Sequence, residues 1–179
     1  MAENEPITLK EVQLRLGVPQ HVLIHLCEKG VIEPDFADTT GRGKRREFSQ
    51  RNLFEFGVAL SLRKFEIPVA TTALVIRLLR SFARATKKLV PDFELPGFLL
   101  ENDVELAFHI YDGDFLVFSA RGGVLRKMVL LGVRIDPSRE PSARPRIEKL
   151  DGLPPSFDAR LDIDLSRIAQ KTSRKPLRI

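Results

Sequence analysis

Apolar residues near the N-terminus recur with the period of two short helices. In residues 9–16, LKEVQLRL, they fall three and four positions apart, and Thr8 with Glu11 matches the capping-box pattern of a helix start. Gly17 is expected to end this helix, because glycine adopts the left-handed C-terminal conformation readily. A second apolar stripe runs through VPQHVLIHLCEKG and ends at Gly30. Two short helices around a tight turn suit a DNA-binding helix–turn–helix, and equally any small helical hairpin.

The next segments predict a loop and two longer helices. Residues 33–48 contain a proline and two glycines and end in the strand-like REF, a composition that fits a β-hairpin wing. Ser49 is expected to cap a helix through about Lys64, and Pro68 to begin a longer helix that ends near Lys88. The apolar stripe of this longer helix extends over about 20 residues, or ~30 Å, which is long for the core of so small a unit. We therefore expect part of it to pack against a second copy of the chain.

After the helices, the pattern changes to the alternation that is typical of strands. VELAFHIYDGDFLVFSARGGVLRKMVLLGVRI alternates on both sides of Asp112-Gly113, and an Asp-Gly pair between two such runs is a strong hairpin signal. Residues 98–135 therefore predict an antiparallel sheet of three or four strands, and the proline-rich residues 136–158 predict an irregular connector. ARLDIDL alternates again, and Ser166 is expected to cap a short final helix. The aromatic residues of this region are expected to form the core of the sheet rather than a ligand site: Phe98, Phe108, Tyr111, Phe115 and Phe118.

The composition fits a globular protein of a reducing compartment. Hydrophobic residues make up 43% of the 179 positions, enough for a core and too many for a disordered chain. The only cysteine, Cys27, excludes a disulfide within the chain and a cysteine-rich zinc site. The acidic, polar N-terminus does not fit a signal peptide, and no apolar run approaches the ~20 residues of a membrane span. We therefore expect a soluble, cytoplasmic protein with no membrane contact.

The net charge of +5 is concentrated in one part of the chain. Residues 39–90 hold twelve Lys/Arg and three Asp/Glu, a balance of +9. Residues 1–38 hold three Lys/Arg and seven Asp/Glu, a balance of −4, and residues 91–179 hold fourteen of each sign. Clustered positive charge indicates a surface that binds a polyanion such as nucleic acid, although basic faces also occur on ordinary soluble proteins.

Residues 7–82 resemble the MerR family of bacterial transcription regulators. The resemblance lies in the order and spacing of ITLKEVQLRLGV, then CEKGVIEP, then RREFSQRNLFEFGVALSLRKFEIPVATTALVIRLL. The family has a wing that ends in an arginine two residues before an aromatic residue and a serine, which matches Arg46, Phe48 and Ser49. The resemblance implies a dimeric regulator that binds double-stranded DNA through its helix–turn–helix and wing.

The sequence departs from the family pattern in the second helix. The family typically has Arg-Tyr-Tyr there, in contact with DNA phosphates, and the matching positions in this chain are Ile24, His25 and Leu26. The wing must then supply more of the electrostatic attraction to DNA. Gln20 at the start of this helix suits an adenine edge through its amide, with His21 beside it. The predicted DNA-binding residues are Gln20, His21, His25, Arg42, Lys44, Arg45 and Arg46.

The fold class that follows is α+β. We expect an N-terminal, MerR-like winged helix–turn–helix with a long helix, followed by a small antiparallel β-rich C-terminal domain. The predicted divisions are residues 1–67 for the DNA-binding domain, residues 68–90 for the long helix as a candidate dimerisation element, and residues 91–179 for the β-rich domain of unknown role. That last domain matches no effector domain, so it could bind an effector, a partner protein or the second subunit.

The sequence predicts no enzyme, no cofactor and no metal. His21 and His25 are four positions apart, a spacing that can hold a metal, but only one further histidine exists and no acidic cluster completes a site. Asp162 and Asp164 share a strand face and are expected to be solvated. No P-loop, GxSxG, HExxH or glycine-rich dinucleotide loop is present in the sequence. MerR-type sensing by thiolates is excluded because no cysteine follows the long helix.

Two functions therefore stay open. The first is a sequence-specific transcription regulator that binds duplex DNA as a homodimer, for which two-fold symmetry predicts a palindromic site. The alternative is a protein-interaction module on a MerR-like fold with weak or no DNA binding, which the loss of the family arginine at Ile24 would allow. Salt-dependent binding to duplex DNA separates the two.

Overall fold

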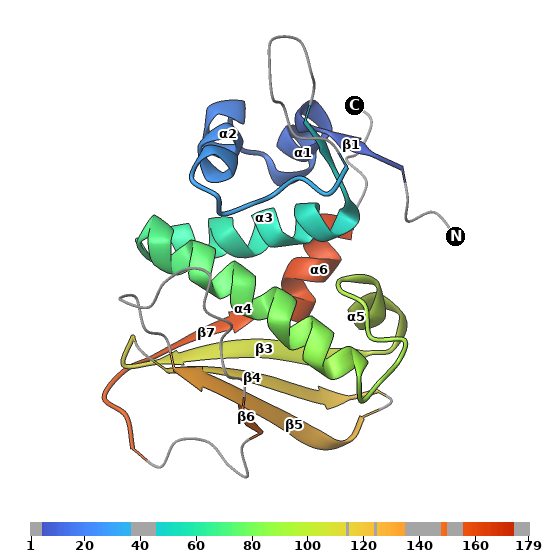
Figure 1. The fold of residues 1–179 in the computed structure, drawn as a ribbon, viewed down its shortest axis with the longest axis vertical. Coiled ribbons are helices and arrows are strands. Elements are labelled where there is room, and N and C mark those ends of the chain that lie inside the picture. Colours follow the sequence, from blue (N-terminus) through green and yellow to red (C-terminus); the bar gives the residue numbers. More distant parts are fainter. Residues whose placement is uncertain are drawn as a thin grey trace. The chain divides into compact units, whose positions relative to one another are not determined.

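The computed structural model describes residues 5–36, 46–113, 115–123, 125–134, 148–149 and 156–173, with the backbone alone for 125–134 and 148–149. Helices and antiparallel strands make up this part of the chain, so the protein has the mixed α+β character that the sequence predicts (Figure 1). None of the described helices combines the length and the hydropathy that crossing a membrane requires.

The chain forms two units, and both boundaries between them fall inside helices. The first unit contains residues 1–76 and 168–179, and the second contains residues 77–167. Helix α4 (Val69–Lys87) begins in the first unit and ends in the second, whereas α6 (Leu165–Ser173) begins in the second and ends in the first. The elements that lie wholly in the first unit are β1 (Ile7–Thr8), α1 (Leu9–Leu16), α2 (Gln20–Glu28), β2 (Glu47–Phe48) and α3 (Gln50–Arg63). The three-part division expected from the sequence stays a prediction.

The first unit is mostly helical around an apolar core. Its helices begin and end close to the predicted positions, and Ser49 caps α3 as expected. Phe48 of β2 and Phe56 of α3 are fully buried and meet edge to face, with ring centroids 5.3 Å apart. Burial of such large aromatic side chains is a main source of stability in a small unit.

The C-terminal part of α6 packs closely on α3 within this unit. A Cβ atom added at Gly57 of α3 would lie 2.8 Å from the Cγ2 atom of Ile168 and 2.9 Å from that of Thr172. These distances are too short for a real contact, so only glycine allows the two helices to approach this far. The last helix of the chain is thereby built into the unit that contains the first two helices.

The second unit is built on a five-stranded antiparallel sheet in the order β6-β5-β4-β3-β7 (Figure 1). Its elements are α5 (Gly97–Glu101), β3 (Val104–Tyr111), β4 (Phe115–Gly122), β5 (Leu125–Arg134), β6 (Glu148–Lys149) and β7 (Arg160–Asp164). The β3–β4 hairpin turns at Asp112 and Gly113, which both have positive φ, as the sequence predicts. The Asp112 carboxylate also accepts hydrogen bonds from the backbone of Asp158 and Ala159, at 2.9 and 2.8 Å.

Aromatic residues form the core of this unit. Phe82 in the C-terminal half of α4 stacks on Phe118 of the sheet, with centroids 4.4 Å apart, and also contacts Phe93 at 5.8 Å. Phe98, Phe108, Phe118 and Tyr111 are buried, which confirms the prediction that they belong to the core. Phe115 is half-buried.

Three expectations about this unit are wrong. Residues 98–101 belong to α5 rather than to a strand, and the connector 136–158 contributes the short strand β6. Ser166 does not cap the last helix. Instead Asp164 accepts a hydrogen bond from the Arg167 backbone at 2.8 Å, because the helix begins at Leu165, two residues earlier than a Ser166 cap implies. The Ser166 hydroxyl bonds to the backbone of β3 at Leu106 and Val104.

The long helix α4 buries most of its large apolar residues within a single chain. Val75, Ile76, Leu78, Leu79 and Phe82 are each 2% exposed or less. No residue of α4 is among the large exposed hydrophobic side chains of the described chain. Most of the apolar stripe is therefore covered within one chain, with Val69 and Leu74 half-buried, and the homodimer stays a prediction.

Candidate nucleic-acid interface

The N-terminal helix pair is set by local signals at each end. At the start of α1 the Glu11 N–H donates to Thr8 Oγ1 at 3.3 Å, and the Thr8 N–H donates to the Glu11 carboxylate at 2.9 Å. This backbone hydrogen bond from Thr8 lowers the pKa of Glu11 below its ordinary value. Gly17 ends α1 in the left-handed conformation, with φ at 65°. Residues 17–19 then form the turn that leads into α2.

Helix α2 has one face in the core and one in solvent. Leu23 and Leu26 are 0% and 2% exposed and fix the inner face. Gln20 and His21 in the first turn are exposed, and His25 one turn after His21 is half-buried. The outer face thus presents an amide and two imidazoles, groups that can donate to base edges or phosphates.

Ile24 is half-buried beside these polar groups on α2. Its side chain offers no hydrogen-bond donor, so this turn of α2 has no fixed positive charge of the kind that an arginine would supply. Any strong attraction to a phosphate backbone must come from cations outside α2.

Residues 36 and 46–48, which flank the segment 37–45, are anchored in the first unit. On its C-terminal side, β2 pairs with β1, where Ile7 lies opposite Phe48 and Thr8 lies opposite Glu47. On its N-terminal side, the Phe36 N–H donates to the Glu47 carbonyl at 3.4 Å. The C-terminal flank is therefore paired with β1, and the N-terminal flank is bonded to β2.

A buried amide reinforces this anchorage. Asn52 of α3 is fully buried, and its Oδ1 atom accepts hydrogen bonds from the Asp35 N–H at 2.8 Å and the Ser49 N–H at 3.3 Å. Its Nδ2 group donates to the Glu33 carbonyl at 3.0 Å and to the Glu55 carboxylate at 3.2 Å. One side chain thus uses all its groups to join residues 33–35 to the start of α3.

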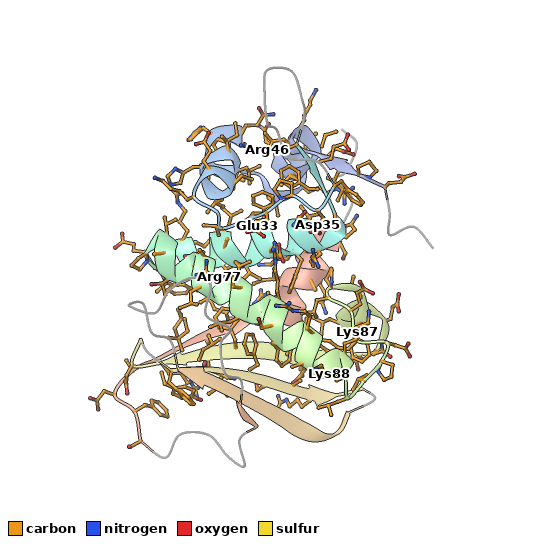
Figure 2. All side chains as sticks on the ribbon, in the orientation of Figure 1. Glu33, Asp35, Arg46, Arg77, Lys87 and Lys88 are labelled. Carbon is orange, nitrogen blue, oxygen red and sulfur yellow. The ribbon has the colours of Figure 1, made fainter. Side chains whose placement is uncertain are left out.

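Charged side chains complete the network around Asp35, which Figure 2 shows near Glu33. The Asp35 carboxylate accepts hydrogen bonds from the Ser49 hydroxyl and from the Arg51 guanidinium. Arg51 Nε also lies 3.9 Å from the carboxylate of Glu55, which is 2% exposed. The network fixes the point at which the chain enters the segment 37–45.

The structure places four of the seven predicted DNA-binding residues. Gln20, His21 and His25 lie together on the outer face of α2, and Arg46 is half-buried directly before β2 in the same unit. Figure 2 shows Arg46 in the part of this unit that contains α1, α2 and β1. The other three predicted residues lie outside the described part of the chain: Arg42, Lys44 and Arg45.

Sequence reasoning identified Ser49 as a cap but missed Asn52 and Asp35. The Ser-x-x-Asn spacing of a capping box was the available signal, and the box is present between Ser49 and Asn52. The contacts to Glu33 and Asp35 span 17 to 19 positions, so no local pattern indicates them.

A second missed cluster lies on the sheet of the other unit. His109 Nδ1 lies 2.6 Å from the Asp162 carboxylate, and His109 Nε2 lies 2.8 Å from the Ser119 hydroxyl. The strand register explains it, because His109 is directly opposite Asp162 and Ser119 is diagonal to it. Asp162 also pairs with Arg160 Nε at 2.9 Å. Its carboxylate is therefore exposed to solvent, as expected, but also engaged with two neighbouring side chains.

No metal-binding group emerges from the described residues. Among them, His, Cys, Asp and Glu side chains nowhere gather in threes that could hold an ion. The pair His21 and His25 thus has no third ligand in this part of the chain.

No protein-family model matches the chain, and no curated protein matches it. The resemblance of residues 7–82 to the MerR family therefore stays a prediction. The molecule has a helix with an exposed polar face, a basic sequence segment whose following strand β2 pairs with β1, and a marked separation of charge along the chain.

Proposed function

We propose that the protein is a sequence-specific transcription regulator of the MerR type, which binds duplex DNA as a dimer. Helix α2 would read base edges, and the basic residues 42–46 would form a wing that contacts phosphates. The observation that carries this proposal is the construction of the first unit, in which α2 exposes Gln20 and His21 and β1 anchors the root of the basic segment. Winged helix–turn–helix proteins use such a helix in the major groove with a loop on the backbone.

The charge distribution supports these separate roles for α2 and the wing. Residues 1–38, which include α1 and α2, have a balance of −4, so α2 is not the source of the electrostatic attraction. The wing has four cations in five positions, Arg42 and Lys44 to Arg46. Phosphate contacts supply affinity and position, whereas base contacts supply specificity. A basic wing suits the phosphate contacts, and the uncharged side chains exposed on α2 suit the base contacts.

The alternative is a protein-interaction module with weak or no DNA binding. Ile24 favours it, because this half-buried residue stands where the MerR pattern has a phosphate-binding arginine. The two proposals differ in one measurable property. A DNA-binding protein loses affinity steeply as salt rises, since bound phosphates release counterions, and a protein-interaction module shows no such duplex binding.

Titration of the full chain into labelled duplex DNA at several salt concentrations tests the proposal. A wing variant with Arg42→Gln, Lys44→Gln and Arg45→Gln is expected to bind more weakly, with a salt slope that is shallower by about 0.9 for each phosphate that the wing no longer neutralises. A charge-matched control with Arg121→Gln, Arg167→Gln and Lys171→Gln removes three exposed cations elsewhere and is expected to retain the wild-type slope.

Absence of duplex binding by the wild-type chain at low salt would contradict the proposal and favour the protein-interaction module. Equal losses of affinity in the wing variant and the charge-matched control would also contradict it, because the effect would then reflect net charge rather than the wing.

A further inference from the structure

All the charged residues in the second half of α4 are basic. No Asp or Glu occurs between Glu66 and Asp92, whereas the C-terminal part of the helix and the residue after it hold five cations. This basic face of α4 consists of Arg77, Arg80, Arg84, Lys87 and Lys88.

The five cations share one side of the helix. With 3.6 residues per turn, they fall within about 100° of its circumference. The opposite side is apolar and buried, with Leu79 at 2% and Phe82 at 0% exposure. Arg84, Lys87 and Lys88 are exposed, and Figure 2 shows Arg77 on α4 and Lys87 with Lys88 at its C-terminal end.

Contacts among the described residues leave the charges of four of these cations largely uncompensated: Arg77, Arg84, Lys87 and Lys88. Lys87 lies 3.5 Å from the carboxylate of Glu94, but the two side chains are 54% and 75% exposed, and such pairs are weak and screened. Arg84 donates to the neutral Ser81 hydroxyl at 3.2 Å. Arg77 and Lys88 have no carboxylate partner among the described residues.

An ordinary solvated helix face mixes charges of both signs, because like charges three or four positions apart destabilise a helix. Attraction to the negative C-terminal end of the helix dipole accounts for Arg84, Lys87 and Lys88. It does not account for Arg77, which lies more than two turns before that end. A binding surface for an anion accounts for all of them.

We propose that the basic face of α4 is a second contact surface for the phosphate backbone of duplex DNA, in addition to the wing. The inference rests on the proposed function, because it assigns a second site to the same ligand. The face extends about 16 Å from Arg77 to Lys88 at 1.5 Å per residue, and duplex DNA carries about ten phosphates over that length. Three of the five cations are arginines, whose planar forks match phosphate oxygens.

The same salt titration tests this face with its own variant. Arg77→Gln, Arg84→Gln and Lys88→Gln keep the side-chain stems and the helix propensity while removing three cations. We expect duplex affinity near 0.1 M salt to fall about ten-fold or more and the salt slope to become shallower by up to about 2.7. The single change Arg84→Gln, at an exposed position, should make the slope shallower by about 0.9 and keeps the test valid if the triple variant unfolds.

The outcomes separate this proposal from the proposed function. Wild-type affinity and slope in both α4 variants, with weakened binding in the wing variant, would overturn the second contact surface alone. Failure of the wild-type chain to bind any duplex would overturn both proposals. If the α4 variants lose no more affinity than the charge-matched control, the second contact surface is overturned. Binding of poly-glutamate in place of duplex DNA would also overturn it, since the partner would then be an acidic protein.

Discussion

At the residue scale, the side chain of Asn52 connects two segments that are far apart in the sequence. Its amide is fully buried and bonds to the backbone of Glu33, Asp35 and Ser49. Buried polar groups stabilise a fold only when their partners are present, and each group left without one destabilises it. The position of the proposed wing thus depends on a residue that would not itself touch DNA.

Asn52→Ala is expected to lower the free energy of unfolding by about 2–3 kcal/mol, because it leaves several buried groups without hydrogen bonds. Denaturant unfolding followed by circular dichroism measures the change. Gln170→Ala, at an exposed position on α6, is the control and should change stability by less than about 0.5 kcal/mol. A destabilisation by Asn52→Ala as small as that of the control would show that the network does not hold the segment 33–35.

The residues of this network also show how far the sequence predicts local structure. Ser49 was identifiable as a cap because a capping pattern is complete within four positions. The contacts of Asn52 with Glu33 and Asp35 were not, because they depend on how the chain folds back over 17 to 19 positions. The same limit applies to His109, whose partner Asp162 lies 53 positions away.

At the element scale, the close approach of α3 and α6 depends on a missing side chain. The Cγ2 methyl groups of Ile168 and Thr172 occupy the space where a Cβ atom at Gly57 would lie. Both belong to β-branched side chains, which have little rotamer freedom in a helix, so neither methyl can move aside easily.

Gly57→Ala is therefore expected to destabilise the first unit although alanine favours helices. Overpacking costs about 1–3 kcal/mol, and the gain in helix propensity offsets about 1 kcal/mol of it. Hydrogen exchange should show faster exchange of the α6 amides in this variant than in the wild type. Arg63→Ala, at an exposed position in the same helix, is the control. A Gly57→Ala protein more stable than the wild type would contradict the close contact.

Secondary structure was predictable where a single spacing of apolar residues or a single turn signal dominates the sequence. The helices α1 to α4 and the β3–β4 hairpin follow from apolar spacing, capping residues and Asp112-Gly113. Residues 98–101 did not, since a short apolar run fits a strand as well as a helix. The pairing of β7 with β3 requires a return across about 50 positions, which no local pattern encodes.

At the scale of the whole molecule, the distribution of charge and of buried surface indicates which segments are suited to bind DNA. The acidic balance of residues 1–38 and the surplus in residues 39–90 separate the proposed reading helix from the proposed phosphate contacts. Most of the large apolar residues of α4 are buried within one chain, so dimerisation does not follow from an uncovered stripe. The basic face of α4 instead gives this helix a proposed role in contacting DNA phosphates.

Selection of bound sequences from a pool of random duplexes by the full chain is the most direct test of sequence-specific DNA binding. A dimer that reads DNA through α2 should enrich two inverted half-sites whose centres lie about one helical turn, or ~10 base pairs, apart. Gln20→Ala with His21→Ala should erase the base preference while retaining salt-dependent binding. A final pool no different from the starting pool, at salt concentrations where the protein binds, would contradict the claim that this protein recognises a DNA sequence.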